Sequence, residues 1–275
     1  MPRIDRILAH NLGLSRRVAT RLFRDRRVTL ADGTPLTDPT LKVAPSQLPW
    51  TVRVDDDEHS LYARYHVLQH KPVGVVTALR DGRHPTARGL LGDEVPLADD
   101  LRAVGRLDLD ASGLLLWTTD GALLHRLTHP RYAIPRTYQV ALAAPFALPD
   151  DLGAVVLDDG YRPAIHALAR IERAALHPGL GVPDGCEHFA EVTISTGVFH
   201  EVKRIFAALG SSVVGLCRVR YGGVELPVDL APGEHRALDL HALFAGIHPR
   251  PPAPGESDDL AAAAGDDDDD DDDDG

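Results

Sequence analysis

GRLDLDASGLLLWTTDG, residues 105–121, carries the clearest indication of how this chain folds. An arginine and two aspartates, Arg106, Asp108 and Asp110, precede the apolar run at 114–117, which is typical of a buried strand. A loop that enters such a strand holds its side chains on a rigid edge, as active sites require. Aspartate is also a common turn residue. Spacing alone therefore leaves Asp108 as either a catalytic carboxylate or a turn former.

Strand-like segments rich in Val, Ile, Thr and aromatic residues lie on both sides of this string. They are YHVLQHKPVGVVTA at 65–78, read as two strands, RTYQVALAA at 136–144, FAEVTIS at 189–195 and SSVVGLCRVRYGGVEL at 211–226. Helical patterns occur between them at 122–129 and 200–209. The mixture predicts an α+β fold with a mainly antiparallel sheet and helices packed against it.

Composition narrows the class of protein. No run approaches the roughly eighteen apolar residues of a membrane span, and the opening MPRIDRILAH lacks the pattern of a secretory signal. We therefore expect a cytoplasmic protein without a membrane partner. Cys186 and Cys217 have neither CxxC spacing nor companion histidines, so neither a disulfide framework nor a metal site is predicted.

The charge is distributed unevenly along the chain. Of 41 acidic and 29 basic residues, twelve acidic and one basic lie beyond residue 249, so the remaining chain is nearly neutral. Three zones follow: a basic segment at 1–54, a mixed segment at 61–247, and a tail at 248–275 that is expected to be disordered. The charged string VDDDEHS, 54–60, is read as a linker. The tail is either a solvated extension or an acidic mimic of RNA.

The basic segment has the features of a nucleic-acid-binding module. It holds ten basic and four acidic residues. Ser15 is a good N-cap for a helix through residue 25, with an inner face of Val18, Ala19, Leu22 and Phe23. RVTLADGTPL, 27–36, is read as a hairpin around Asp32-Gly33.

Two short helices followed by this hairpin, DRILAHNLGLSRRVATRLFRDRRVTL, resemble the S4-type RNA-binding domain. The resemblance implies that arginines contact phosphates, with an affinity that weakens as salt rises. The candidate contacts are Arg16, Arg17, Arg21, Arg24 and Arg27. On charge alone, an amphipathic helix pair with a solvated basic face explains the segment equally well.

The string at 105–121 resembles the GRLDxDTxGLLLxTxDG signature of pseudouridine synthases of the RsuA type, and the likeness extends over residues 1 to about 247. It implies an enzyme that converts a uridine of ribosomal RNA into pseudouridine without cofactor or metal. Asp108 would be the nucleophilic or charge-stabilising residue. A base must leave the stack to be reached, and Arg106 would grip or fill the vacated space.

Two more strings carry the same resemblance. HPRYAIPRTYQV, 129–140, implies that Tyr138 stacks on the target uracil. In ISTGVFHEVKRIFAALGSSVVGLCRVRYGGVEL, 194–226, Lys203 would pair with the catalytic carboxylate, with Arg204 as its alternative, and Leu216 would form an apolar wall. Lys71 of the Lys-Pro pair is a further candidate RNA contact.

The likeness is incomplete at three positions, where Ala111, Val198 and His70 replace the usual Thr, Arg and Asn. DGRHPTARGLL, 81–91, and HEVKRIFAA favour a small-subunit rRNA target. A large-subunit rRNA synthase and a non-catalytic S4-type RNA-binding protein are the alternatives. An acid-pair hydrolase is disfavoured because Asp108 and Asp110 would point apart on an extended backbone. We expect a monomer whose partner is rRNA or a ribosome assembly intermediate.

Overall fold

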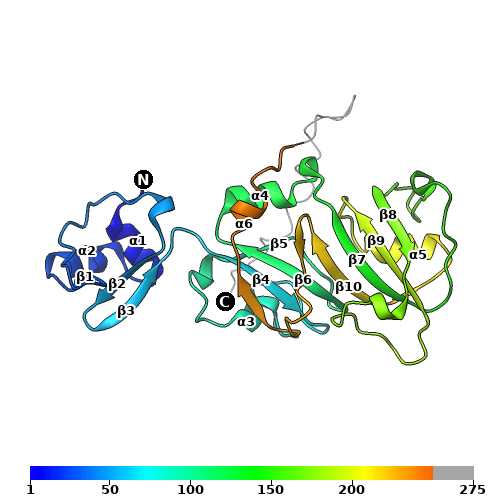
Figure 1. The fold of residues 1–275 in the computed structure, drawn as a ribbon, viewed down its shortest axis with the longest axis horizontal. Coiled ribbons are helices and arrows are strands. Elements are labelled where there is room, and N and C mark those ends of the chain that lie inside the picture. Colours follow the sequence, from blue (N-terminus) through cyan, green and yellow to red (C-terminus); the bar gives the residue numbers. More distant parts are fainter. Residues whose placement is uncertain (250–275) are drawn as a thin grey trace, which may run out of the picture.

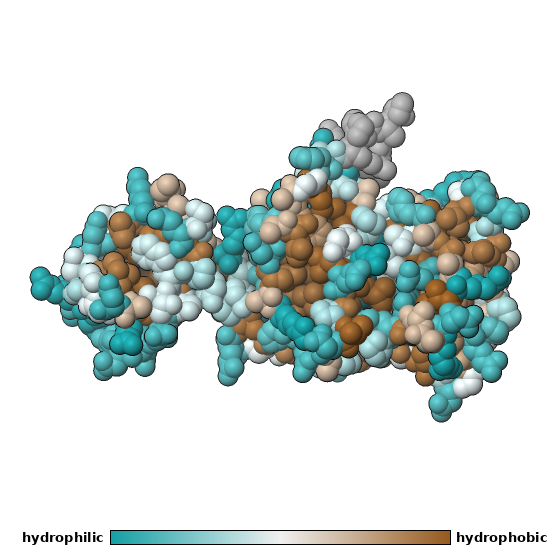
Figure 2. All heavy atoms as spheres, in the orientation of Figure 1, coloured by the Kyte–Doolittle hydropathy of each residue, from teal (hydrophilic) through white to brown (hydrophobic). Residues whose placement is uncertain are grey.

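The computed structural model describes residues 1–249, and the predicted tail lies outside the described residues from 250 onward. The structure has a small N-terminal unit, residues 1–61, joined by residues 62–65 to a larger body (Figure 1). The surface view shows the same narrow connection, and hydrophilic side chains surround the N-terminal unit (Figure 2). Within the described part of the chain, no helix is both long and apolar enough to cross a membrane.

The N-terminal unit packs two helices on a three-stranded antiparallel sheet. Its elements are α1 (Ile4–Asn11), α2 (Arg16–Arg24), β1 (Val28–Leu30), β2 (Trp50–Val54) and β3 (Asp57–Leu61). As predicted, Ser15 caps α2, because its hydroxyl accepts a hydrogen bond from the Val18 amide at 3.3 Å. Leu8, Phe23 and Leu61 are among the residues of a separate apolar core. Val18 is 44% exposed and does not belong to this core, so its predicted place on the inner face of the helix is wrong.

Two other expectations for this unit need correction. The string VDDDEHS is not a linker: it forms the turn between β2 and β3 and most of β3 itself. Charged side chains suit this strand because it lies at the edge of its sheet, where they discourage pairing with other chains. The hairpin predicted around Asp32-Gly33 is present, with an antiparallel bridge of Thr29 and Pro35 and hydrogen bonds of 2.8 Å from the Leu30 amide to the Thr34 carbonyl and from the Leu36 amide to the Val28 carbonyl. The strand partner of β1 is β2, and the unit reaches Leu61 rather than residue 54.

The body is built on one nine-stranded sheet, with strand order β12-β4-β6-β10-β7-β9-β8 and two short strands beside this path. The strands are β4 (His66–Lys71), β5 (Arg102–Val104), β6 (Ala111–Thr118), β7 (Arg136–Leu142), β8 (Ile165–Arg170), β9 (His188–Ile194), β10 (Val213–Tyr221), β11 (Val224–Glu225) and β12 (His235–Ala237). Every pair is antiparallel except β6 with β10. The predicted mainly antiparallel sheet is therefore confirmed.

Helices cover both faces of this sheet. One face packs against α3 (Ala87–Leu91) and α5 (Glu201–Ala208), and the other against α4 (Gly121–Thr128) and α6 (Leu240–Leu243). All of β6 is buried, with Leu115 and Trp117 in one core and Leu114 and Leu116 in the other. This two-sided burial explains why the run at 114–117 is continuously apolar. Short 3₁₀ turns lie at Pro45–Gln47, Ala98–Asp100, Pro130–Tyr132, Leu152–Ala154 and Arg173–Ala175.

The second strand predicted within 65–78 does not form. After β4, Pro72 has no amide hydrogen to give to a sheet, and Gly74 has a φ of 82°. Val76 makes only an isolated parallel bridge with Thr86. The chain turns instead toward the loop before β6, where the Gly74 amide donates to the Leu109 carbonyl at 2.7 Å.

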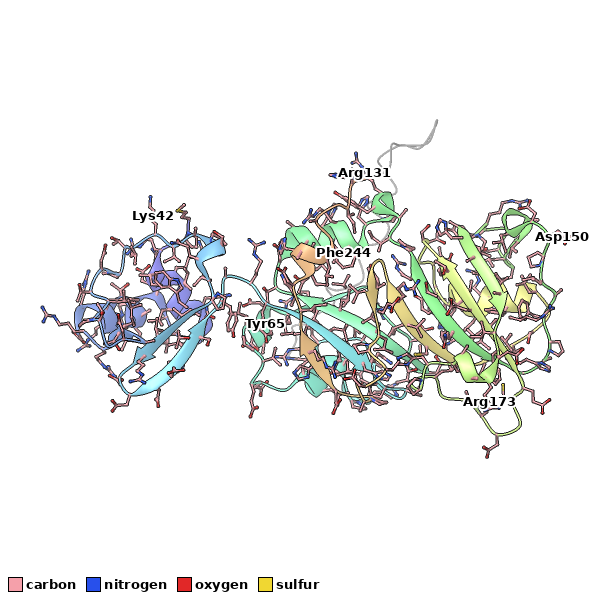
Figure 3. All side chains as sticks on the ribbon, in the orientation of Figure 1. Lys42, Tyr65, Arg131, Asp150, Arg173 and Phe244 are labelled. Carbon is pink, nitrogen blue, oxygen red and sulfur yellow. The ribbon has the colours of Figure 1, made fainter. Side chains whose placement is uncertain are left out.

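The connection between the two parts is held on both sides. The Asn11 side chain accepts from the Tyr62 amide at 2.8 Å and donates to the Tyr62 carbonyl at 2.9 Å. On the body, the Tyr65 amide donates to the Thr119 hydroxyl at 2.9 Å. Tyr65 lies at the junction in Figure 3. The N-terminal unit is thus attached through a short segment that is anchored at each end.

Candidate active site

Asp108 lies in a loop whose backbone carbonyls accept hydrogen bonds from two buried cations, Lys71 and Arg218. Lys71 Nζ donates to the carbonyls of Asp108 at 2.9 Å, Ala111 at 2.6 Å and Pro72 at 3.0 Å. Arg218 donates to the Leu114 carbonyl through Nε at 2.8 Å and to the Arg106 carbonyl through Nη1 at 3.4 Å. The loop is therefore rigid on the side that faces the sheet.

The assignment of Lys71 as an RNA contact is wrong. The residue is completely buried, and its ammonium is surrounded by carbonyl oxygens. Burial lowers the pKa of Lys71 to about 8, although the charges of Asp108 and Asp110 oppose that shift. Sequence reasoning missed this supporting role because it depends on tertiary contacts between residues far apart in the chain.

Other contacts fix the outer part of the loop. The Thr77 hydroxyl donates to the Leu107 carbonyl at 2.9 Å and accepts from the Leu107 amide at 3.1 Å. Gly113 follows with a φ of 113°, and a Cβ there would lie 2.4 Å from the Arg218 carbonyl oxygen. A glycine is thus required where β6 and β10 approach each other.

Lys203 provides the positive charge beside Asp108, as predicted. Its Nζ lies 3.3 Å from Asp108 Oδ2 and 2.7 Å from Asp110 Oδ1. The Asp108 side chain remains 34% exposed. Asp108 and Asp110 were predicted to point apart, and that is wrong: the Ala111 amide donates to the Asp108 carbonyl at 3.1 Å, so the backbone turns and one lysine reaches both carboxylates.

The environment keeps Lys203 and Asp110 charged at neutral pH. Partial burial opposes the shift, but the hydrogen bond to Asp110 and the two carboxylate charges raise the pKa of Lys203 above its usual value. Burial alone would raise the pKa of Asp110. The hydrogen bond and the charge of Lys203 outweigh burial and hold this pKa below its usual value. Lys203 is therefore an ammonium held between two carboxylates.

His200 is a site residue that sequence reasoning missed. It precedes α5 with a φ of 51°, and its Nε2 lies 3.7 Å from Asp108 Oδ2. The available signal was its position three residues before Lys203, which places two side chains on the same side of a helix end. Arg204, the alternative to Lys203, points elsewhere and forms ion pairs with Asp158 at 2.5 Å and Asp159 at 2.6 Å.

Tyr138 and Leu216 lie in the core beside the loop. Both belong to the buried cluster that contains Leu107 and Ala111, and Leu216 pairs in register with Ala111. Tyr138 is 8% exposed. Neither residue lines the open pocket described next, so their contact with a base stays a prediction.

An open pocket of about 270 Å³ adjoins Asp108. Arg106, Asp108 and His200 contribute polar groups to it. The remaining lining residues are Val76, Thr77, Ala78, Asp81, Leu107 and Leu109. Arg106 is exposed at this pocket, and its contact with RNA stays a prediction.

The five arginines proposed as phosphate contacts are all exposed on the N-terminal unit. Three form ion pairs: Arg16 with Asp5, Arg21 with Asp25 and Arg27 with Asp55. The pairs of Arg21 and Arg27 are exposed on both sides and therefore weak, so they compete poorly with a phosphate, whereas Arg16 faces the buried carboxylate of Asp5. Arg17 and Arg24, seven residues apart on α2, lie on one side of the helix.

Two further observations concern metals and thiols. Within residues 1–249, no group of three His, Cys, Asp or Glu side chains is arranged to hold a metal ion. Cys186 and Cys217 are buried free thiols, and burial raises the pKa of Cys217 to about 11. Cys217 is therefore not a reactive nucleophile at neutral pH.

The site is thus a carboxylate paired with a lysine, on a rigid loop that enters β6, a central strand of the mixed sheet. The family model described as "RNA pseudouridylate synthase" matches residues 65–208. The chain belongs to this family, which confirms the predicted fold and enzyme class. The enzyme class is thus a synthase and not an acid-pair hydrolase.

Known relatives resemble most of the chain. It is 39% identical over 239 residues to "Ribosomal small subunit pseudouridine synthase A" of Yersinia pestis, covering 86% of this chain and 94% of that protein. The protein of the same name from Escherichia coli (strain K12) is 39% identical over 240 residues, with 86% and 96% covered. A solved structure described as "Crystal structure of pseudouridylate synthase" is 30% identical, with a TM-score of 0.49 and coverage of 88% and 98%.

Proposed function

We propose that this enzyme isomerises a specific uridine of small-subunit ribosomal RNA to pseudouridine, with Asp108 as its catalytic carboxylate. The names of the relatives support the choice of RNA. The observation that carries the catalytic role is the position of Asp108, whose Oδ2 lies 3.3 Å from Lys203 Nζ at the edge of an open pocket.

The reaction requires a carboxylate held close to the ribose and the base of the uridine. The N1–C1′ bond of the uridine breaks, the uracil turns, and C5 bonds to C1′ while the C5 proton leaves and N1 takes up a proton. No group is imported and nothing is oxidised, so no cofactor is required. The Asp108 carboxylate either attacks C1′, adds to C6, or stabilises a developing cation.

Lys203 orients Asp108 for each of these roles. Its ammonium contacts Asp110 more closely than Asp108, at 2.7 Å against 3.3 Å. Asp110 therefore holds the lysine in place while Asp108 stays accessible to substrate. We assign Asp110 as a positioning residue, because it acts through Lys203.

The RNA would be bound by both parts of the protein. Arg106 grips the strand or fills the space left by the flipped uridine, while Tyr138 stacks on the uracil and Leu216 forms its apolar wall. The N-terminal unit acts as an S4-type module that contacts phosphates through α2. We propose that the enzyme works as a cytoplasmic monomer.

Tritium release from [5-³H]uridine-labelled transcripts tests this function. Wild-type protein should release tritium from small-subunit rRNA, and Asp108→Asn should release none while unfolding at the same urea concentration. Release from large-subunit rRNA alone would replace the proposed target. Binding without release from any rRNA or assembly intermediate would favour the non-catalytic RNA-binding protein.

A further inference from the structure

Phe199 is an exposed aromatic residue beside the active site. It is 77% exposed, whereas the five other phenylalanines of the chain are all buried. An exposed phenylalanine ring gains nothing from the apolar core, and large exposed apolar groups often mark contact surfaces. Its position therefore requires an explanation.

The turn that presents Phe199 is rigid. Glu201 is buried, and its carboxylate accepts hydrogen bonds from the Thr196 hydroxyl and from the Val198 amide, the latter at 3.3 Å. Arg136 Nη1 donates to the Thr196 carbonyl at 3.0 Å. These contacts fix both ends of the turn, so the ring is held in place without being covered.

Phe199 is linked to the catalytic carboxylate through one neighbour. Its ring stacks on that of His200, with centroids 3.7 Å apart and an angle of 22° between the planes. His200 lines the pocket, and its Nε2 lies 3.7 Å from Asp108 Oδ2. The two rings thus form a stack beside the pocket, in which the Phe199 ring is largely exposed.

We propose that Phe199 stacks on an unpaired base next to the target uridine and so positions the RNA over the pocket. This inference rests on the proposed function. Nucleic-acid bases stack on aromatic rings whatever their sequence, and phenylalanine has no hydrogen-bonding group that would select one base. An RNA strand that delivers a uridine to Asp108 comes close to this ring, because His200 contacts both the ring and the carboxylate.

Three substitutions test stacking against simple apolar contact. Phe199→Ala removes the ring, Phe199→Leu keeps an apolar side chain, and Phe199→Trp keeps an aromatic surface. Leu243→Ala is the matched control, because Leu243 is also an exposed apolar residue, 51% exposed, but lies on α6. Since these side chains are exposed, all four variants should unfold at the same urea concentration as wild type.

The measurements are single-turnover tritium release from a [5-³H]uridine-labelled small-subunit rRNA transcript, with enzyme in excess, and direct binding of the same transcript. We expect the Ala and Leu variants to raise the half-saturating enzyme concentration and the Kd about tenfold, the size of one base stack. The rate at saturation should change less. The Trp variant and the Leu243 control should stay within about twofold of wild type.

Several outcomes would overturn the inference while leaving the proposed function intact. One is unchanged Kd in Phe199→Ala with active wild type, and another is full rescue by leucine. A third is dissociation of an oligomer by Phe199→Ala without loss of RNA affinity, which would assign the ring to contact between copies. Absence of release by wild type would instead reject the proposed function, and the binding data would still decide whether the ring stacks on RNA.

Discussion

Lys71 Nζ donates a hydrogen bond to the backbone carbonyl of Asp108 at 2.9 Å, from a position with no exposure to solvent. The proposed catalytic carboxylate is therefore carried by a loop that a buried lysine holds in place, and it is paired with the partly exposed Lys203. The two lysines have opposite pKa shifts, because burial dominates at Lys71 and the two carboxylates dominate at Lys203. This division of roles leads to separate predictions.

Lys71→Met should destabilise the protein and abolish activity. It leaves three carbonyls without their donor, which costs roughly 2–4 kcal/mol in the free energy of unfolding, and it frees the Asp108 loop. Urea unfolding and tritium release measure the two effects. Lys42→Met, which removes an exposed lysine, is the stability control. A Lys71→Met protein with wild-type stability and turnover would show that the loop does not depend on Lys71.

The contribution of Lys71 to stability should increase with pH. Its pKa is about 8 when folded and 10.5 as an ordinary lysine, so between these values the unfolded chain binds more protons than the folded one. The free energy of unfolding therefore rises with pH through this group. The difference between wild type and Lys71→Met should grow in favour of wild type from pH 8 to pH 10. Urea titrations at each pH measure it, and a constant difference would contradict the lowered pKa.

Lys203→Met should reduce the rate at saturating RNA by about 100-fold, as expected when one aligned electrostatic group is lost from an active site. Stability should change by less than about 1 kcal/mol, because these ion pairs are partly exposed. Asp110→Asn should cause a smaller loss, since the cation remains beside Asp108. Single-turnover rates rank the variants. A larger loss in Asp110→Asn than in Lys203→Met would make Asp110 more than a positioning residue.

The double variant Arg17→Ala, Arg24→Ala should weaken RNA binding and reduce the slope of log affinity against log salt by about two. Both side chains lie on one side of α2 in the N-terminal unit. Affinity measured at four salt concentrations gives the slope. Arg131→Ala removes an exposed arginine from the body and serves as control (Figure 3). An unchanged slope in the double variant would assign the phosphate contacts to other residues.

Features with a local cause could be predicted from the sequence. Ser15 caps α2 through atoms three residues away, and β6 is recognisable because both of its faces are buried. The position of Lys203 followed from a resemblance whose motifs span the body. Each of these depends on short-range geometry or on a pattern that the sequence displays.

Features set by tertiary contacts could not be predicted. β3 carries the charges of a linker and is recognisable as a strand only from its place at a sheet edge. A lysine is usually exposed, and the sequence gives no sign that Lys71 is buried. Three carbonyls from two segments of the chain nevertheless surround its ammonium group. Lys203 contacts both Asp108 and Asp110 because the backbone turns between residues 108 and 111. The prediction assumed an extended backbone there.

The clamp of Asn11 on Tyr62 has a consequence for the reach of the enzyme. Tyr62 is fixed to the N-terminal unit and Tyr65 to the body, Arg64 pairs with Asp120 of the body at 3.1 Å, and His10 Nε2 lies 3.0 Å from Asp100 Oδ2. The two parts are therefore connected by a short and braced joint. If the N-terminal unit binds RNA as proposed, the length of this joint sets the distance along the RNA between the bound helix and the modified nucleotide. Lengthening it by a few residues would change how far along an RNA the modified nucleotide lies from the gripped helix, without altering either end.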